Sequence, residues 1–141
     1  MSAVARLLLD THAWLWFLGG TDGRLSKNLI ARIEAASGAG QLWMSVISIW
    51  EIGLLEAKGR VHLGMIVEEW VAEALAKPGV RLAKLEPAIA LAASRLPGVF
   101  HADPADRFLV ATARALNAVL VTADKRIIGY AKHGYLKVGT I

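Results

Sequence analysis

The chain has 141 residues, the length of one domain, and we expect a single domain over residues 1–141. It contains no cysteine, so disulfides, thiolate zinc sites and a cysteine nucleophile are excluded. The net charge of +4 permits a polyanionic partner without requiring one.

The apolar segments bear on localisation and on partners. The apolar run within residues 1–10 is shorter than a signal peptide requires, and no run approaches the roughly 18 apolar residues of a membrane span. We therefore expect a cytoplasmic protein without a membrane partner. Because 55% of the residues are hydrophobic, we expect helices that are buried on more than one side or that contact an apolar partner.

Short apolar runs predict buried strands, and apolar residues at helical spacing predict helices between them. The first half is predicted to contain, in chain order, a strand over 5–10, a helix over 11–20 closed by Gly19–Gly20, a helix from Ser26 to about Gly38, a strand over 42–46, and helices over 48–59 and around 65–75. The second half is predicted to contain a strand over 80–85, a helix from Pro87 to about Leu96, a helix over 104–117, a strand over 118–122, a short helix over 124–134 and an edge strand over 135–139. The side chains predicted to face the core from the first-half helices include Leu29, Ile30, Ile33, Met65, Ile66, Trp70, Val71 and Leu75.

The alternation of strands and helices predicts the fold class. Strands joined by helical crossovers form a parallel sheet with helices on both faces. We therefore expect an α/β protein, a three-layer α/β/α domain around a central parallel sheet of four to five strands. The stretch over 97–104 is predicted to be a loop within this domain.

Four acids are predicted to gather at one edge of the sheet, the edge outside the carboxyl ends of the strands. Asp10 closes the first strand, and Asp124 lies two residues beyond the fourth. Glu51 falls in the first turn of the helix that follows the second strand. Asp106 falls in the first turn of the helix that enters the fourth strand, and a helix that precedes a strand begins at this same edge.

Each of these acids also has a purely structural interpretation. Ser48 and Glu51 have the spacing of a capping box, Asp124 can cap the last helix, and Asp103 before Pro104 is a good helix start. Asp10 has the weakest structural alternative, because no cap role is expected at the end of an apolar strand. Four acids at one edge repel one another, and Mg²⁺ or Mn²⁺ would remove that conflict. The convergence therefore favours a metal site.

Four segments carry a family resemblance: "LLLDTHAWLW", "SVISIWEIGLL", "DPADRFLVATA" and "LVTADKRI". They resemble, in order, the acidic motifs of PIN-domain nucleases, and more closely those of the VapC toxins of type II toxin–antitoxin pairs. The resemblance implies an endoribonuclease, a cognate antitoxin as partner, and a homodimer. The sequence departs from the family pattern at Ala102 and Ala105, and neither departure changes one of the acids.

The resemblance implies that a Mg²⁺ or Mn²⁺ centre for RNA cleavage is formed by Asp10, Glu51, Asp106 and Asp124. We expect Glu51 to act through water or as the base that orients the attacking water, and the three aspartates to be direct ligands. The residues expected to support these acids are Asp103, Thr11 and Thr122. The residues expected to contact RNA phosphates, with solvated surface charge as the alternative, are Arg107, Lys125 and Arg126.

We do not expect the histidines to bind the metal ion or the tryptophans to stack on bases. His12 is expected to orient groups beside Asp10, because hard oxygen sites rarely take imidazole. His62, His101 and His133 lack metal-ligand spacing with one another. Trp14 and Trp50 lie in apolar helical patterns, and core or interface packing is expected for the tryptophans rather than base stacking.

Other protein classes fit the sequence less well. A signalling receiver needs an aspartate at the end of the third strand, where this chain has Lys84, Leu85 and Glu86. A haloacid-dehalogenase-like phosphatase needs a second aspartate at the position of His12. The alternative that stays open is a non-catalytic PIN-like binding module, which has the same fold and against which only the intact acids argue.

Overall fold

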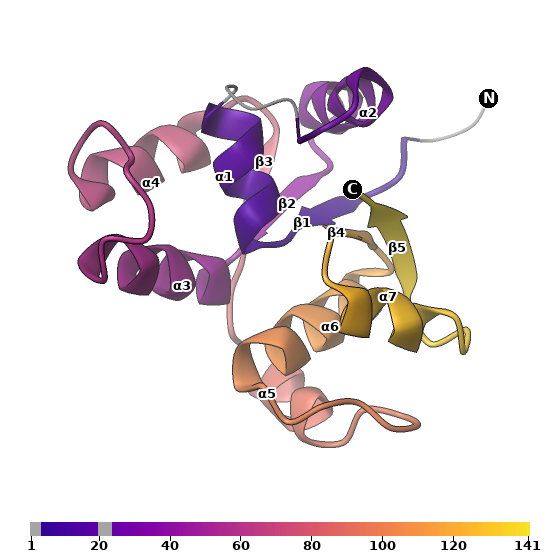
Figure 1. Ribbon diagram of the computed structural model, residues 1–141. Coiled ribbons are helices and arrows are strands. Elements are labelled where there is room, and N and C mark those ends of the chain that lie inside the picture. The colour runs from indigo at the N-terminus through magenta and orange to yellow at the C-terminus, as the bar shows by residue number, and fades with distance from the viewer. Residues whose placement is uncertain (1–3, 20–23) are drawn as a thin grey trace.

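The computed structural model describes residues 4–19 and 24–141 (Figure 1). Its strands are β1 (Leu7–Leu9), β2 (Leu42–Ser45), β3 (Val80–Ala83), β4 (Val119–Thr122) and β5 (Lys137–Thr140). Its helices are α1 (Thr11–Gly19), α2 (Lys27–Gly38), α3 (Val46–Ala57), α4 (Val67–Ala76), α5 (Pro87–Ser94), α6 (Pro104–Leu116) and α7 (Lys125–Ala131). Within these residues, no helix is both long and apolar enough to cross a membrane.

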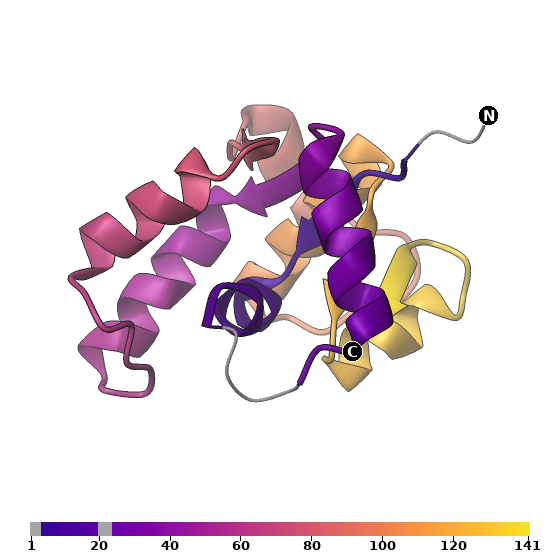
Figure 2. The same ribbon diagram turned by 90° about the horizontal axis from the view of Figure 1, so that it is seen from above.

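The strands form one parallel sheet in the order β3-β2-β1-β4-β5. β1 lies at its centre and consists of three buried leucines, because a central strand covered on both faces has no polar side to present. Figures 1 and 2 show helices on both sides of the sheet. The predicted three-layer α/β/α fold and the predicted edge strand are therefore confirmed.

Two hydrophobic clusters lie on opposite faces of the sheet. Successive residues of β1 contribute to them alternately, since Leu7 and Leu9 belong to one cluster and Leu8 to the other. The first cluster joins α1, α2, α3 and α4 to the sheet, and Trp14 is its largest fully buried side chain. The second cluster joins α6 and α7 to the sheet. Together the two cores fix the carboxyl ends of β1 and β4 side by side.

Some predicted boundaries and faces were wrong. α3 begins at Val46, because Ser45 at the end of β2 accepts a hydrogen bond from the Ile47 N–H and caps the helix without a loop. α4 begins only at Val67, which leaves Met65 and Ile66 exposed instead of facing the core. Ile30 is also exposed. Of the predicted Gly19–Gly20 helix end, Gly20 lies outside the described residues.

Gly79, in the turn before β3, provides a test of the packing that holds this sheet edge. A Cβ on Gly79 would lie 1.6 Å from the Ser37 carbonyl oxygen, and the residue has a φ of +76°. We expect Gly79→Ala to lower the free energy of unfolding by about 3 kcal/mol or more, measured by urea denaturation. Gly59→Ala is the matched control, since Gly59 has a φ of +69° but nothing within 4 Å, and should cost only about 1 to 2 kcal/mol. Equal losses for the two variants would contradict the steric explanation.

Candidate metal centre

A pocket of about 470 Å³ lies at the carboxyl edge of the sheet. All four predicted site acids and Asp103 line it, although they come from distant parts of the sequence. The residues that line the pocket are Asp10, Thr11, His12, Trp16, Arg24, Glu51, Asp103, Asp106, Leu109, Ala123, Asp124 and Arg126. The structure thus brings the acids together in one place, as the sequence predicts.

Asp10 lies between β1 and α1. Its Oδ1 accepts a hydrogen bond of 2.8 Å from the Ala13 N–H, and its carbonyl accepts the first helical bond from Trp14. Asp10 therefore caps α1, and the expectation that it has no cap role was wrong: the strand passes directly into the helix. Burial raises the pKa of this carboxyl, and hydrogen bonds with Thr122 and Ala13 partly offset the effect. Capping fixes the carboxylate at the pocket wall.

Thr122, at the end of β4, links two of the acids. It is fully buried and hydrogen-bonded to the Asp10 carboxylate. Its Oγ1 also accepts a hydrogen bond of 3.0 Å from the Asp124 N–H. Neighbouring strand ends are thereby joined through one hydroxyl.

Glu51 lies in the second turn of α3, one turn later than predicted, because the helix begins at Val46. Its Oε1 is 2.6 Å from the Thr11 Oγ1, which lies 3.1 Å from the Ser48 Oγ. Ser48 is inside the helix, so the capping-box interpretation of Ser48 and Glu51 was wrong. Burial raises the pKa of Glu51, and the Thr11 hydrogen bond opposes this.

Asp106 is the most strongly perturbed acid of the pocket. Burial, followed by the negative charges of Asp103, Asp124 and Glu51, raises its pKa from 3.8 to about 7, against the opposing charge of Arg126. Its side chain is only 15% exposed. A carboxyl with this pKa is poised to lose its proton when a cation arrives.

Asp103 and Asp124 cap helices, as their structural interpretation predicts. Asp103 accepts from the Ala105 and Asp106 N–H groups at the start of α6. Asp124 accepts from the Arg126 and Ile127 N–H groups at the start of α7. Burial raises the pKa of Asp124, but the hydrogen bonds from Arg126 and Ile127 outweigh it, and the net shift is downward.

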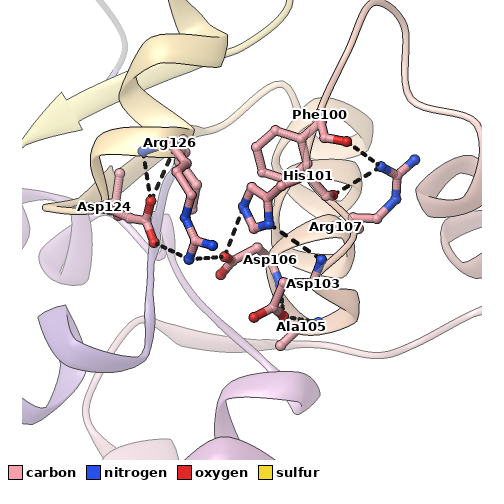
Figure 3. Close-up of polar contacts among 10 residues, drawn as sticks. Phe100, His101, Asp103, Ala105, Asp106, Arg107, Asp124 and Arg126 are labelled. Atoms are coloured by element: carbon pink, nitrogen blue, oxygen red, sulfur yellow. Dashed lines mark hydrogen bonds and ion pairs between the residues drawn. The ribbon is translucent and has the colours of Figure 1, made fainter.

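The Arg126 guanidinium already brings a positive charge to two of the acids. Its Nη2 lies 3.4 Å from Asp106 Oδ2 and 3.3 Å from Asp124 Oδ2, as Figure 3 shows. The side chain is 59% exposed, so it can move aside at small cost. It supplies the charge compensation that a divalent cation would supply.

The donor chemistry of the pocket fits Mg²⁺ or Mn²⁺, since its acidic groups are hard oxygen ligands. Among residues 4–19 and 24–141, however, no three His, Cys, Asp or Glu side chains are arranged to hold a metal ion without rearrangement. Departure of Arg126 would withdraw the guanidinium from Asp106 and Asp124 together. The residues therefore fit a cation that replaces the guanidinium, with rotation of the carboxylates.

The structure does not bring all three predicted phosphate-contact residues into the pocket. Arg107 points away from the acids in Figure 3, and its guanidinium donates to the carbonyls of Ala93, Phe100 and His101. Lys125 is exposed and does not line the pocket. Of the three, Arg126 alone lines it.

Arg107 is therefore expected to act on stability. Arg107→Met keeps the aliphatic stem but removes three hydrogen bonds from a charged donor, and should lower the free energy of unfolding by about 2 to 3 kcal/mol in urea denaturation. Arg95→Met, at an exposed position, is the control and should stay within about 0.5 kcal/mol of the parent chain. A stable Arg107→Met protein with weakened RNA binding would instead favour the phosphate role.

Two residues near the acids were not predicted from the sequence to lie at the site. Arg24 lines the pocket, and its guanidinium carbon lies 5.1 Å from the centre of the Trp16 ring. Nothing in the sequence connects it with the acids. His101 approaches Asp106 to 3.1 Å, although metal-ligand spacing gave no reason to select it. Its place two residues before Asp103 was the available signal.

The fold and the pocket together define a class, a three-layer α/β/α domain with five acids at the carboxyl edge of its parallel sheet. The family model of the PIN domain matches residues 7–133. The chain belongs to the PIN domain family, as the four acidic motifs indicated.

Individual relatives agree with this assignment. Ribonuclease VapC22 of Mycobacterium tuberculosis is 36% identical over 121 residues, which cover 86% of this chain and 88% of that protein. VapBC2 from Rickettsia felis, solved bound to a DNA fragment from its promoter, aligns with a TM-score of 0.67 at 14% identity over 95% of this chain and 97% of that one. FitAcB from Neisseria gonorrhoeae aligns with a TM-score of 0.61 at 17% identity over 94% and 95%. The resemblance to VapC-type proteins is thereby confirmed.

Proposed function

We propose that this chain is a Mg²⁺- or Mn²⁺-dependent endoribonuclease and the toxin of a type II toxin–antitoxin pair. The observation that carries the proposal is the pocket in which Asp10, Glu51, Asp106 and Asp124 meet. The pKa of about 7 for Asp106 supports it, because a carboxyl so destabilised as an anion gains most from a bound cation. The 36% identity to a protein named as a ribonuclease supports the same activity.

In this proposal, Asp10, Asp106 and Asp124 hold the metal ion. The ion would supply a bound water of lowered pKa and would neutralise charge on the scissile phosphate. Glu51 orients the attacking water and accepts its proton, for which a carboxyl of raised pKa is suited. Thr11 holds the Glu51 carboxylate in place through its 2.6 Å contact.

The remaining pocket residues would bind and orient the substrate. Arg126, once it leaves Asp106 and Asp124, lies at the pocket mouth, where its guanidinium can contact an RNA phosphate. Lys125 is exposed beside it and adds positive charge for the same backbone. Thr122 and Asp103 keep the ligand carboxylates in position through the strand end and the α6 cap.

The proposed partners follow from the relatives. The resemblance to VapC-type toxins, together with the 36% identity to Ribonuclease VapC22, supports a cognate antitoxin for this chain. We further propose a homodimer that acts in the cytoplasm. A non-catalytic binding module is the alternative function, and the five acids in one pocket argue against it, because mutual repulsion makes such a cluster costly unless it is used.

The experiment that tests the function uses the purified chain and a single-stranded RNA several tens of nucleotides long. We expect internal cleavage with Mg²⁺ or Mn²⁺, loss of cleavage with EDTA, and its return when Mn²⁺ is added in excess. Cleavage that persists in EDTA would overturn the metal-dependent mechanism. RNA that stays intact at every metal concentration but is bound by the chain would favour the binding module.

A further inference from the structure

His101 lies in the loop before α6, against the acid that the pocket perturbs most. Its Nε2 is 3.1 Å from Asp106 Oδ2, and Figure 3 shows the ring directed toward this carboxylate. The Nε2 atom is inaccessible to solvent, and within the described residues it has no well-aligned hydrogen-bond acceptor. The buried Nε2 of His101 therefore faces Asp106. A modest rotation of the Asp106 carboxylate would complete a hydrogen bond between them.

The loop holds the His101 ring firmly. The ring packs on Phe100, whose ring centre is 4.3 Å away, and Phe100 in turn packs on Tyr130 of α7 at 4.9 Å. The carbonyls of both Phe100 and His101 accept hydrogen bonds from Arg107. Arg107 and the aromatic rings therefore set the position of His101 relative to α6.

The hydrogen bonds also determine which ring nitrogen carries the proton. The Asp103 N–H donates to Nδ1 of His101 at 3.3 Å, so Nδ1 is an acceptor. In a neutral imidazole the other nitrogen then carries the hydrogen. The ring consequently presents an N–H group, not a lone pair, to the Asp106 oxygen.

We propose that His101 is a positioning residue for the metal centre, whose Nε2–H orients the Asp106 carboxylate for a divalent cation. The inference rests on the proposed metal-dependent function. The N–H donor can hold one Asp106 oxygen, which leaves the other oxygen for the cation. Carboxylates that bind metal ions in proteins are commonly held in place by such hydrogen-bond donors. His101 is not itself a ligand in this arrangement, because Nδ1 accepts the Asp103 N–H and Nε2 carries the hydrogen that is directed at Asp106.

Two substitutions of similar size separate the hydrogen bond from packing. His101→Gln retains an N–H donor at about the reach of Nε2, whereas His101→Met fills similar space without one. His133→Met, at an exposed histidine that does not line the pocket, is the control. Mn²⁺ binding is measured by electron paramagnetic resonance of the free ion, and folding by thermal denaturation in EDTA.

We expect His101→Met to weaken Mn²⁺ binding by roughly 10- to 100-fold, while His101→Gln stays within about threefold of the parent chain and His133→Met is unchanged. Equal Mn²⁺ affinity in the Met and Gln variants would overturn the positioning role, whether both match the parent or both are weakened. If the Met variant fails to fold, the Gln variant still decides, since loss of Mn²⁺ binding by a folded His101→Gln protein contradicts the proposal.

Failure of this inference differs from failure of the proposed function. A parent chain that binds no Mn²⁺ and cleaves no RNA would remove the metal centre itself. A parent chain that binds Mn²⁺ and cleaves RNA, with a His101→Met variant that binds Mn²⁺ equally well, would remove only the role of His101.

Discussion

Asp10→Asn and Asp106→Asn are each expected to reduce Mg²⁺-dependent RNA cleavage by about a thousandfold or more. Removal of one anionic ligand weakens metal binding and the charge stabilisation that the metal gives the transition state, which is worth several kcal/mol. The measurement is the single-turnover cleavage rate of a labelled RNA at saturating Mg²⁺.

The asparagine variants are chosen so that the fold survives. At position 10, the amide oxygen can still accept the Ala13 N–H that begins α1. At position 106, the substitution removes a carboxylate whose ionisation the pocket opposes, and should not destabilise the metal-free protein. Glu68→Gln on the exposed face of α4 is the matched control and should retain full activity. Cleavage by either aspartate variant at the control rate would remove that residue from the site.

The metal-free protein is expected to lose stability as the pH rises from about 4 to about 7. The pKa of Asp106 is about 7 in the folded chain and 3.8 by its ordinary value, so over this range the folded state holds a proton that the unfolded state has released. Asp10 and Glu51, whose pKa values are also raised, act in the same direction. Urea denaturation in EDTA at several pH values measures the effect.

The same ionisation should make Mn²⁺ binding tighter at higher pH. A cation binds the ionised form of Asp106, and with a pKa of about 7 the binding at pH 6 must displace a proton that is absent at pH 8. We expect the apparent Mn²⁺ affinity to fall about tenfold between pH 8 and pH 6. In Asp106→Asn the pH dependence of stability between pH 5 and 7 should be reduced. If the pH dependence of stability is the same in Asp106→Asn as in the parent chain, the group with the raised pKa is not Asp106.

The fold and the location of the site could be predicted because both depend on patterns that the sequence contains. Strands as apolar as Leu7–Leu9 can only be central, and the helices between them require a parallel sheet. In such a sheet, acids that follow strands gather at the carboxyl edge, which is where Asp10 and Asp124 lie. Topology alone was sufficient for these conclusions.

The details that depend on side-chain direction could not be predicted. Ser45 and Ser48 are both plausible helix starts, and only the length of β2 selects Ser45. Arg107 and Arg126 both adjoin acids in the sequence, yet one helix turns Arg107 toward the carbonyls before α6 and the other turns Arg126 into the pocket. His101 reaches Asp106 only because the loop before α6 folds back on that helix.

The most direct test of the account is an anomalous-diffraction map from crystals of the chain grown with Mn²⁺. We predict a manganese peak about 2.1 Å from carboxylate oxygens of Asp10, Asp106 and Asp124, with the Arg126 guanidinium moved away from Asp106. A map without manganese in the pocket, with Arg126 still between Asp106 and Asp124, would contradict the claim that these acids form a metal centre.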